Sequence, residues 1–391
     1  MSRAVPFDAV PNNDPAGVDE RAERWASTMT GYSSKDRKDG IQFAHADSWA
    51  GSGSRLLLTR EAREERQAAT QATLATQAHG AGERAIDEAP DEWRTCFERD
   101  RDRILHATSF RRLAGKTQVF VFPDDHQRTR LTHALEVAQV ATSVARALGL
   151  NVALTEAIAL GHDCGHGPGG HASEDALSPY VPGGFDHALW GANVTLVGLN
   201  LCAETLDGIR NHSWSRPAPA TPEGEVVSWA DRIAYVCHDF EDAVATGVVT
   251  ADSLPATVRE RCGVERREQL GAFIYGMIDA AKVSDRVGMT EAPAEALAQF
   301  RKFNYERIYL RPESVAQASS VIALLRALVE HFAANPTLLP DAHEHAADSA
   351  GALHAAVTYV GGMTDRFACR QGIALLDWPR DQLPRGIDTP L

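Results

Sequence analysis

Apolar residues recur at intervals of three and four from Glu92 onward, a spacing that predicts amphipathic helices. No alternating apolar and polar run of comparable length predicts a strand. Two helical stripes are formed by Leu131, Leu135, Ala138 and Thr142 and by Leu154, Ile158 and Gly161. Gly- and Pro-rich stretches predict loops at 165–173, 178–184 and 215–224. The expected fold class is therefore all-α, a helical bundle whose inner faces carry converging side chains.

The first 90 residues have a different composition. They are rich in Asp, Asn, Ser, Gly, Ala and Gln and carry few large apolar side chains, with one helical stretch near Thr59 to Gln67. Such a segment has little apolar surface to bury. We expect residues 1–90 to form an N-terminal arm that is loosely packed or partly disordered, and residues 91–391 to form the main domain.

The overall composition matches ordinary soluble globular proteins, with 44% hydrophobic and 24% charged residues among 391. The net charge is 39 − 53 = −14, which argues against a surface that attracts nucleic acid or anionic lipid as a whole. The stretch from Arg99 to Arg130 has the opposite charge, because it contains eight basic residues and only four acidic ones, Asp100, Asp102, Asp124 and Asp125. The bases are Arg99, Arg101, Arg103, Arg111, Arg112, Lys116, Arg128 and Arg130. About half of these are expected to pair with Asp100 and Asp102, and the rest to bind phosphate.

The chain begins without a signal peptide, and no 18-residue apolar stretch is apparent, so a cytoplasmic protein outside the membrane is expected. Its six cysteines form no CxxC pair. They are expected to be buried thiols rather than a disulfide framework or a zinc site.

Four metal-competent side chains lie on or beside predicted helices. His133 shares the inward stripe of Val137, and the adjacent His162 and Asp163 end an apolar helix. Asp231 begins an i, i+4, i+8 series with Tyr235 and Asp239. A core histidine, a helix cap and a solvated helix face are the alternatives for the three segments. Together, two histidines and two carboxylates suit a divalent ion of the manganese, magnesium or iron class that keeps open positions.

Histidines also cluster after the His-Asp pair, at His166, His171 and His187. His171 and Glu174 are separated by one helical turn, so the carboxylate can orient the imidazole for proton transfer. Arg130 lies one turn before His133 and is placed to grip a phosphate.

With these residues in this order, the chain resembles the HD-domain superfamily and, within it, the deoxyguanosinetriphosphate triphosphohydrolases. The matching segments, in family order, are RDRILHATSFRRLAGKTQVF (101–120), RTRLTHALEVAQVA (128–141), GHDCGHGPGGHASEDAL (161–177), GGFDH (183–187), LNLCAETLDGI (199–209), VSWADRIAYVCHDFEDA (227–243) and GGMTDRFA (361–368). The resemblance implies an HD-domain helical bundle with peripheral helices, its core at about residues 128–245, followed by a C-terminal helical extension.

The same resemblance implies roles for individual residues. It makes His133, His162, Asp163 and Asp231 the metal ligands, and His171 with Glu174 the acid and base pair. His166 and His187 would line the phosphates, and Arg130 and Arg232 would contact the triphosphate. Tyr235 and Asp239 would bind the sugar of the nucleotide, and Gln118 and Tyr309 would make further contacts with the sugar and the base. Part of Ser48–Arg66 is expected near the site.

The activity expected is metal-dependent hydrolysis of dNTPs, including dGTP, to deoxynucleoside and inorganic triphosphate. Three alternatives stay open: hydrolysis of another nucleotide, trimming of single-stranded DNA ends, and a non-catalytic dNTP sensor. The resemblance implies a homo-oligomer, with hexamers among the family's assemblies, and a nucleotide activator or single-stranded DNA as further partners.

Overall fold

The computed structural model describes residues 15–28, 31–33, 40–49, 51, 57–123, 126–340 and 344–384. Asp124 and Asp125 of the basic stretch, and residues 50 and 52–56 of the segment expected near the site, lie outside them. The chain divides into two compact units, Met1–Leu57 and Leu58–Leu391. The predicted division at residue 90 stays a prediction.

The first unit contains one helix and one small hairpin. Helix α1 spans Pro15–Thr28, and strands β1 (Tyr32–Ser33) and β2 (Gln42–Phe43) pair antiparallel. These two-residue strands are the only ones among the described residues, so the predicted all-α class is confirmed.

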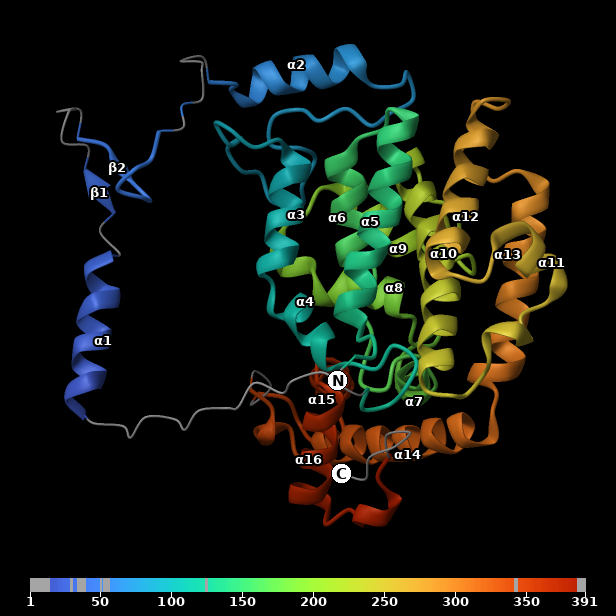
Figure 1. Cartoon of the computed structure of the whole chain (residues 1–391). Coiled ribbons are helices and arrows are strands. Elements are labelled where there is room, and N and C mark those ends of the chain that lie inside the picture. Colours follow the sequence, from blue (N-terminus) through green and yellow to red (C-terminus); the bar gives the residue numbers. More distant parts are fainter. Residues whose placement is uncertain are drawn as a thin grey trace, which may run out of the picture. The chain divides into compact units, whose positions relative to one another are not determined.

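The second unit is a bundle of helices (Figure 1). Its first nine helices are α2 (Arg60–Thr70), α3 (Cys96–His106), α4 (Thr108–Arg112), α5 (Arg130–Leu148), α6 (Val152–Gly161), α7 (His171–Leu177), α8 (His187–Trp190), α9 (Ala203–Asn211) and α10 (Pro222–Ala245). The remaining six are α11 (Ala256–Cys262), α12 (Arg266–Ala281), α13 (Glu291–Asn304), α14 (Pro312–Ala334), α15 (Ala350–Gly361) and α16 (Asp365–Leu376).

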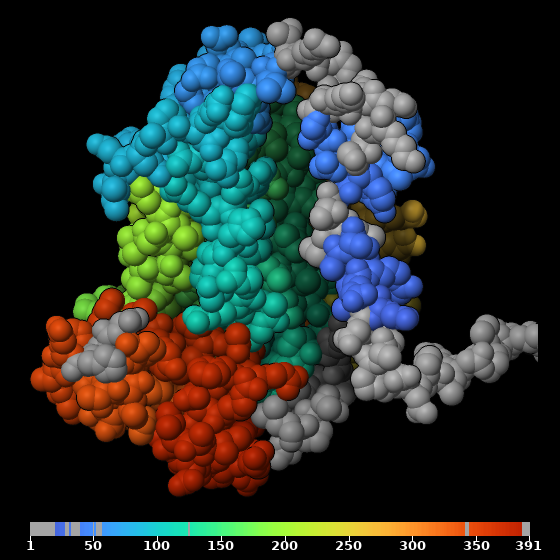
Figure 2. Space-filling view, turned by 90° about the vertical axis from the view of Figure 1, so that its left-hand side faces the viewer, coloured from blue at the N-terminus to red at the C-terminus, as the bar shows by residue number. Residues whose placement is uncertain are grey.

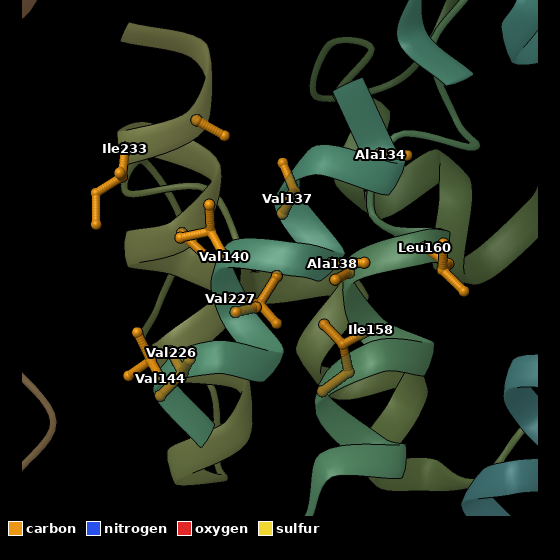
Figure 3. Packing of buried hydrophobic residues seen from close by; sticks show 14 of the residues in the cluster. Ala134, Val137, Ala138, Val140, Val144, Ile158, Leu160, Val226, Val227 and Ile233 are labelled. Atoms are coloured by element: carbon orange, nitrogen blue, oxygen red, sulfur yellow. The ribbon is translucent and has the colours of Figure 1, made fainter. Parts of the chain in front are cut away.

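Helices α5, α6 and α10 form the centre of the larger hydrophobic cluster (Figure 3). Helix α5 ends where Gly149 adopts the left-handed conformation with a φ of 70°, and Asn151 then caps α6 through its side chain. Val137 and Val140 are fully buried. Leu135, predicted on the same buried face as Ala138, is 48% exposed. That assignment was wrong because the buried stripe follows Ala134, Val137 and Ala141 instead.

A second cluster joins α7 to the C-terminal helices α14, α15 and α16. Figure 1 shows α14 running crosswise to α5 and α10, and Figure 2 shows the orange and red C-terminal helices gathered below the cyan surface of α3 and α4. Helix α14 is long and apolar enough, by length and composition alone, to cross a membrane, with a mean hydropathy of 1.2 over 18 residues. This corrects the expectation that no apolar stretch of 18 residues exists. Leu325, Leu328 and Phe332 of α14 are buried against this cluster, as in the core helix of a globular protein.

The contact between α6 and α9 provides a test of the packing. A methyl group at Gly208 of α9 would lie 2.7 Å from Cγ1 of Ile158, a buried side chain of α6. We expect Gly208→Ala to lower the free energy of unfolding by about 1–2 kcal/mol in denaturant titration, because overpacking outweighs the gain in helix propensity. Gly198→Ala is the control, since nothing lies within 4 Å of its added methyl group. Equal stability of the two variants would contradict the packing described here.

Candidate active site

A cavity of about 770 Å³ opens between the central helices and the start of α14. Its lining includes twelve of the fourteen predicted site residues: Gln118, Arg130, His133, Asp163, His166, His171, His187, Asp231, Arg232, Tyr235, Asp239 and Tyr309. The other two do not line it. His162 is fully buried behind the lining, and Glu174 contacts His171 and His187. The structure therefore brings all fourteen residues to one place.

The four predicted metal ligands lie next to one another. Nε2 of His133 is 3.1 Å from Oδ1 of Asp231, and Nε2 of His162 is 3.6 Å from the same oxygen. Nε2 of His162 is also 3.5 Å from Oδ1 of Asp163. One ligand atom from each of His133, His162 and Asp231 fits within 4.8 Å. Helices α5, α6 and α10 thus deliver their donors to a single point.

The orientation of His162 is set by the backbone. This residue caps α6, and its Nδ1–H donates to the carbonyl of Ala159 at 2.7 Å. Because a carbonyl can only accept, the proton is on Nδ1, and Nε2 keeps its lone pair. Nε2 is buried and has no hydrogen-bond partner among the described residues. An unpaired buried acceptor beside two carboxylates is what a metal ligand requires.

The two carboxylates of the cluster are ionised. Burial works to raise the pKa of Asp163, but the Arg130 guanidinium, 2.6 Å away, holds that pKa well below its ordinary range. Burial also opposes ionisation of Asp231, yet the hydrogen bond with His133 keeps its pKa low. The donor set of neutral imidazole and carboxylate oxygen therefore fits a divalent ion.

Four further side chains form a connected group beside the cluster. Glu174 accepts hydrogen bonds from Nδ1 of His171 at 2.9 Å and from Nδ1 of His187 at 2.7 Å. The ring of His187 stacks on His166, with centroids 3.7 Å apart. Burial raises the pKa of Glu174, but these two histidines outweigh it and hold the pKa far below the ordinary range. The side chain of His171 is 75% exposed, so its Nε2 is accessible from the cavity.

A different set of side chains surrounds Asp239 on α10. The hydroxyl of Tyr309 donates to Oδ2 of Asp239 at 2.6 Å, whereas Oδ1 has no partner among the described residues. Burial raises the pKa of Asp239 to about 7. Tyr309 ends a π-helical turn, Tyr305–Tyr309, of the kind found at functional sites. Oε1 of Gln118 is also buried without a described partner.

Most bases of the stretch between Arg99 and Arg130 do not line the cavity and so are not placed to bind a phosphate there. Arg99 and Arg103 pair with Glu88, and Arg101 pairs with Asp102. Asp100, expected to pair with these surface arginines, is instead fully buried against Arg84. Arg128 is held by Glu136, Glu241 and Asp242. Of the arginines in the stretch, Arg130 lines the cavity.

Among the cavity residues that were not predicted from the sequence, three make contacts with predicted site residues that bear on the chemistry. His212 caps α9, and its Nδ1–H donates to the carbonyl of Ile209 at 2.8 Å, which leaves Nε2 3.2 Å from Nε2 of His187. Burial lowers the pKa of His212 to about 4, so it is neutral. Arg301 donates to the Tyr235 hydroxyl at 2.7 Å. The third is Trp214, whose ring lies against Arg232. The signal for His212 is its place at a helix end, which it shares with His162.

The loop that carries His166 and His171 is held by the C-terminal helices. Asp365, the first residue of α16, accepts from the backbone N–H of Gly169 at 2.8 Å and from that of Thr117 at 2.9 Å. The buried ammonium of Lys116 donates to the carbonyls of His166 and Gly361. Gly169 has a φ of 75°, a conformation that favours glycine. This group of contacts, the Asp365 clamp, fixes the loop from both sides.

Parts of the chain match two known families. Residues 130–236 match the HD domain, and residues 287–372 match the phosphohydrolase-associated domain. The first match contains all four candidate metal ligands, and the second contains Tyr309 and Asp365.

The chain is also similar over most of its length to curated proteins. A deoxyguanosinetriphosphate triphosphohydrolase-like protein of Caldanaerobacter subterraneus is 39% identical over 316 residues, covering 79% of this chain and 93% of the relative. A protein of the same name from Clostridium perfringens is 42% identical over 301 residues, covering 73% and 87%. A solved phosphohydrolase of Bacteroides thetaiotaomicron aligns over 70% of this chain and 68% of its own, with 18% identity and a TM-score of 0.43.

The Asp365 clamp makes a prediction about loop order. Asp365→Asn replaces a carboxylate oxygen that faces N–H and O–H donors with an amide group, so one of these hydrogen bonds is lost. We expect the amide hydrogens of Gly169 and Thr117 to exchange with solvent at least about tenfold faster, and the free energy of unfolding to fall by about 1–3 kcal/mol. Asp381→Asn, at an exposed position in the same C-terminal region, is the control. Unchanged exchange in Asp365→Asn would show that the loop does not depend on the clamp.

Proposed function

The chain belongs to the HD-domain family of deoxyguanosinetriphosphate triphosphohydrolase-like proteins, and from this premise we propose that it hydrolyses deoxynucleoside triphosphates, dGTP among them, to a deoxynucleoside and inorganic triphosphate. The observation that carries the proposal is the composition of one cavity. The same space of about 770 Å³ is lined by side chains that can bind a metal, by guanidinium groups and, at one end, by the polar side chains of Asp239 and Tyr309.

The reaction is the attack of water on the α-phosphorus. The new bond joins the water oxygen to phosphorus, and the bond between phosphorus and the 5′-oxygen breaks, so the nucleoside leaves with a proton on that oxygen. A divalent ion held by His133, His162, Asp163 and Asp231 would supply a Lewis acid that polarises a phosphoryl oxygen. Negative charge on the phosphates is met by Arg130, Arg232, His166 and His187, all on the cavity wall.

Proton transfer is assigned to His171. Its Nδ1–H donates to Glu174, which fixes the tautomer and leaves Nε2 free to exchange a proton with the reacting oxygen. The ionised Glu174 stabilises the imidazolium that forms when His171 takes up a proton. His187 shares the same carboxylate, so a change at Glu174 affects both histidines.

Recognition of the sugar is assigned to the Asp239 end of the cavity. The unpaired Oδ1 of Asp239 is a buried acceptor for a sugar hydroxyl, and Tyr309 holds the other oxygen in place. Tyr235 and Gln118 complete this end. A cytoplasmic homo-oligomer with a nucleotide activator or single-stranded DNA as a further partner is the setting in which we propose that the enzyme acts.

The proposal predicts the products of the reaction. Incubation of the full chain with each dNTP and with Mg²⁺ or Mn²⁺ should release deoxynucleoside and intact inorganic triphosphate in equal amounts, separated by ion-exchange chromatography. Release of monophosphate or diphosphate instead would contradict attack at the α-phosphorus with the nucleoside as leaving group. Degradation of single-stranded DNA without dNTP turnover would favour the nuclease.

A variant of Asp231 tests whether the observed hydrolysis takes place in this cavity or comes from a contaminating enzyme. Asp231→Ala removes the oxygen shared by His133 and His162, and we expect bound metal, measured by elemental analysis, and turnover to be lost together. Asp252→Ala, at an exposed position, is the control and should keep both.

The raised pKa of Asp239 predicts a pH dependence. Only the ionised carboxylate can accept a hydrogen bond from Tyr309 at one oxygen and from a sugar hydroxyl at the other. KM for a dNTP should therefore fall about tenfold as the pH rises from 6 to 8 through the pKa of about 7. In Asp239→Asn, KM should be higher and flat across this range.

The raised pKa of Asp239 also predicts how the free energy of unfolding changes with pH. A carboxyl whose folded pKa is raised binds its proton more tightly in the folded state, so its contribution to stability is present below the unfolded pKa and is lost as the pH rises through about 7. The free energy of unfolding of the wild type should therefore fall relative to Asp239→Asn between pH 5 and 8. A parallel pH profile of the two proteins would show that Asp239 does not titrate there.

A further inference from the structure

Arg232 is held in the cavity by an aromatic ring. Its guanidinium carbon lies 3.7 Å from the centroid of the Trp214 ring. Arg232 forms no ion pair with a carboxylate among the described residues, and its buried Nε has no hydrogen-bond partner there. Arg130, in contrast, is paired with Asp163 in the same cavity. Arg232 therefore keeps its hydrogen-bond donors free for a ligand.

The ring that holds Arg232 is itself fixed. The indole N–H of Trp214 donates to the carbonyl of Ser228 at 3.2 Å. Ser228 lies on α10 one turn before Arg232, so one helix carries both the anchor of the ring and the cation that stacks on it. Trp229 packs edge-on against Trp214, with ring centroids 4.8 Å apart. Trp214 is 48% exposed, and these contacts restrict the rotation of its indole.

The surroundings of Arg232 favour an anion. Arg232 shares this part of the cavity wall with a second guanidinium group, that of Arg301. Both guanidinium groups line the cavity, and Arg301 is bound to the hydroxyls of Tyr235 and Tyr305 rather than to an acid. A π face attracts a cation without neutralising it. A carboxylate in the place of Trp214 would instead compete with the phosphates of a substrate.

We propose that Trp214 is a positioning residue that holds the Arg232 guanidinium toward the polyphosphate chain of the substrate. This role rests on the proposed function, because it takes a nucleoside triphosphate as the occupant of the cavity. Trp214 selects for the polyphosphate charge through Arg232 and not for the base. Without the ring, the long arginine side chain gains rotamers that point away from the phosphates, and the entropy of fixing it opposes binding.

The test measures binding of inorganic triphosphate to the full chain by calorimetry in excess Mg²⁺. We expect Trp214→Leu to weaken binding about 3- to 30-fold, the range that a partly buried cation–π contact supports. Trp214→Phe should restore part of the loss, because the phenyl ring keeps a π face. Trp93→Leu, the same substitution at a tryptophan that is 41% exposed and outside the cavity lining, should bind as the wild type does.

A double-mutant cycle shows whether Trp214 acts through Arg232. In an Arg232→Gln background, Trp214→Leu should cause no further loss, because the residue on which it acts is gone. An equal loss in both backgrounds would assign Trp214 a purely structural role and overturn the proposal. Wild-type affinity in Trp214→Leu would also overturn it. Thermal unfolding verifies that each variant is folded, and Trp214→Phe carries the same cycle if the leucine variant does not fold.

Failure of the proposed function would look different. If the wild type binds triphosphate but releases no deoxynucleoside from any dNTP, the assigned reaction is wrong while the role of Trp214 is still measured by the binding cycle. If dNTPs are hydrolysed and the cycle shows no coupling between Trp214 and Arg232, only the positioning role is wrong.

Discussion

The arrangement of this site depends on a hydrogen bond between a histidine and the end of its own helix. His162 on α6 and His212 on α9 each give the Nδ1 proton to the carbonyl three residues earlier. That bond determines the tautomer, turns the ring across the helix end and directs the Nε2 lone pair inward. The rings of these two histidines meet edge to face, with centroids 5.0 Å apart. The ends of two helices thus orient imidazole acceptors through backbone carbonyl groups.

The charges of the site are balanced around this centre. Burial of a carboxylate costs free energy unless an opposite charge or a hydrogen-bond donor compensates it. The carboxylate of Asp163 contacts Arg130 and His166. Glu174 is compensated by two histidines. The guanidinium groups of Arg232 and Arg301 differ, since aromatic rings and hydroxyls hold them. One part of the cavity wall therefore carries charges that are paired with one another, and another part carries two guanidinium groups that form no ion pair among the described residues.

Much of this arrangement could be predicted from the sequence. The all-α class followed from helical periodicity, and the placement of Asp231, Tyr235 and Asp239 along one cavity followed from their spacing on a single helix. His212, Arg301 and Asp365 could not be found in this way, because each comes alone from a distant segment and has no periodic partner. The Leu135 assignment was wrong because small residues such as Ala134 and Ala141 form the buried face, and alanine gives a weak hydrophobic signal.

The Asp365 clamp also relates the site to the order in which the chain is made. Gly169 is separated from Asp365 by 196 residues and Thr117 by 248, which are among the longest separations for hydrogen bonds between the described residues. Contacts of this range form only after both segments exist, and synthesis proceeds from the N-terminus. While the polypeptide is still on the ribosome, the histidine loop has no C-terminal support. Support of the loop that carries His166 and His171 therefore waits until the chain has been synthesised as far as Asp365.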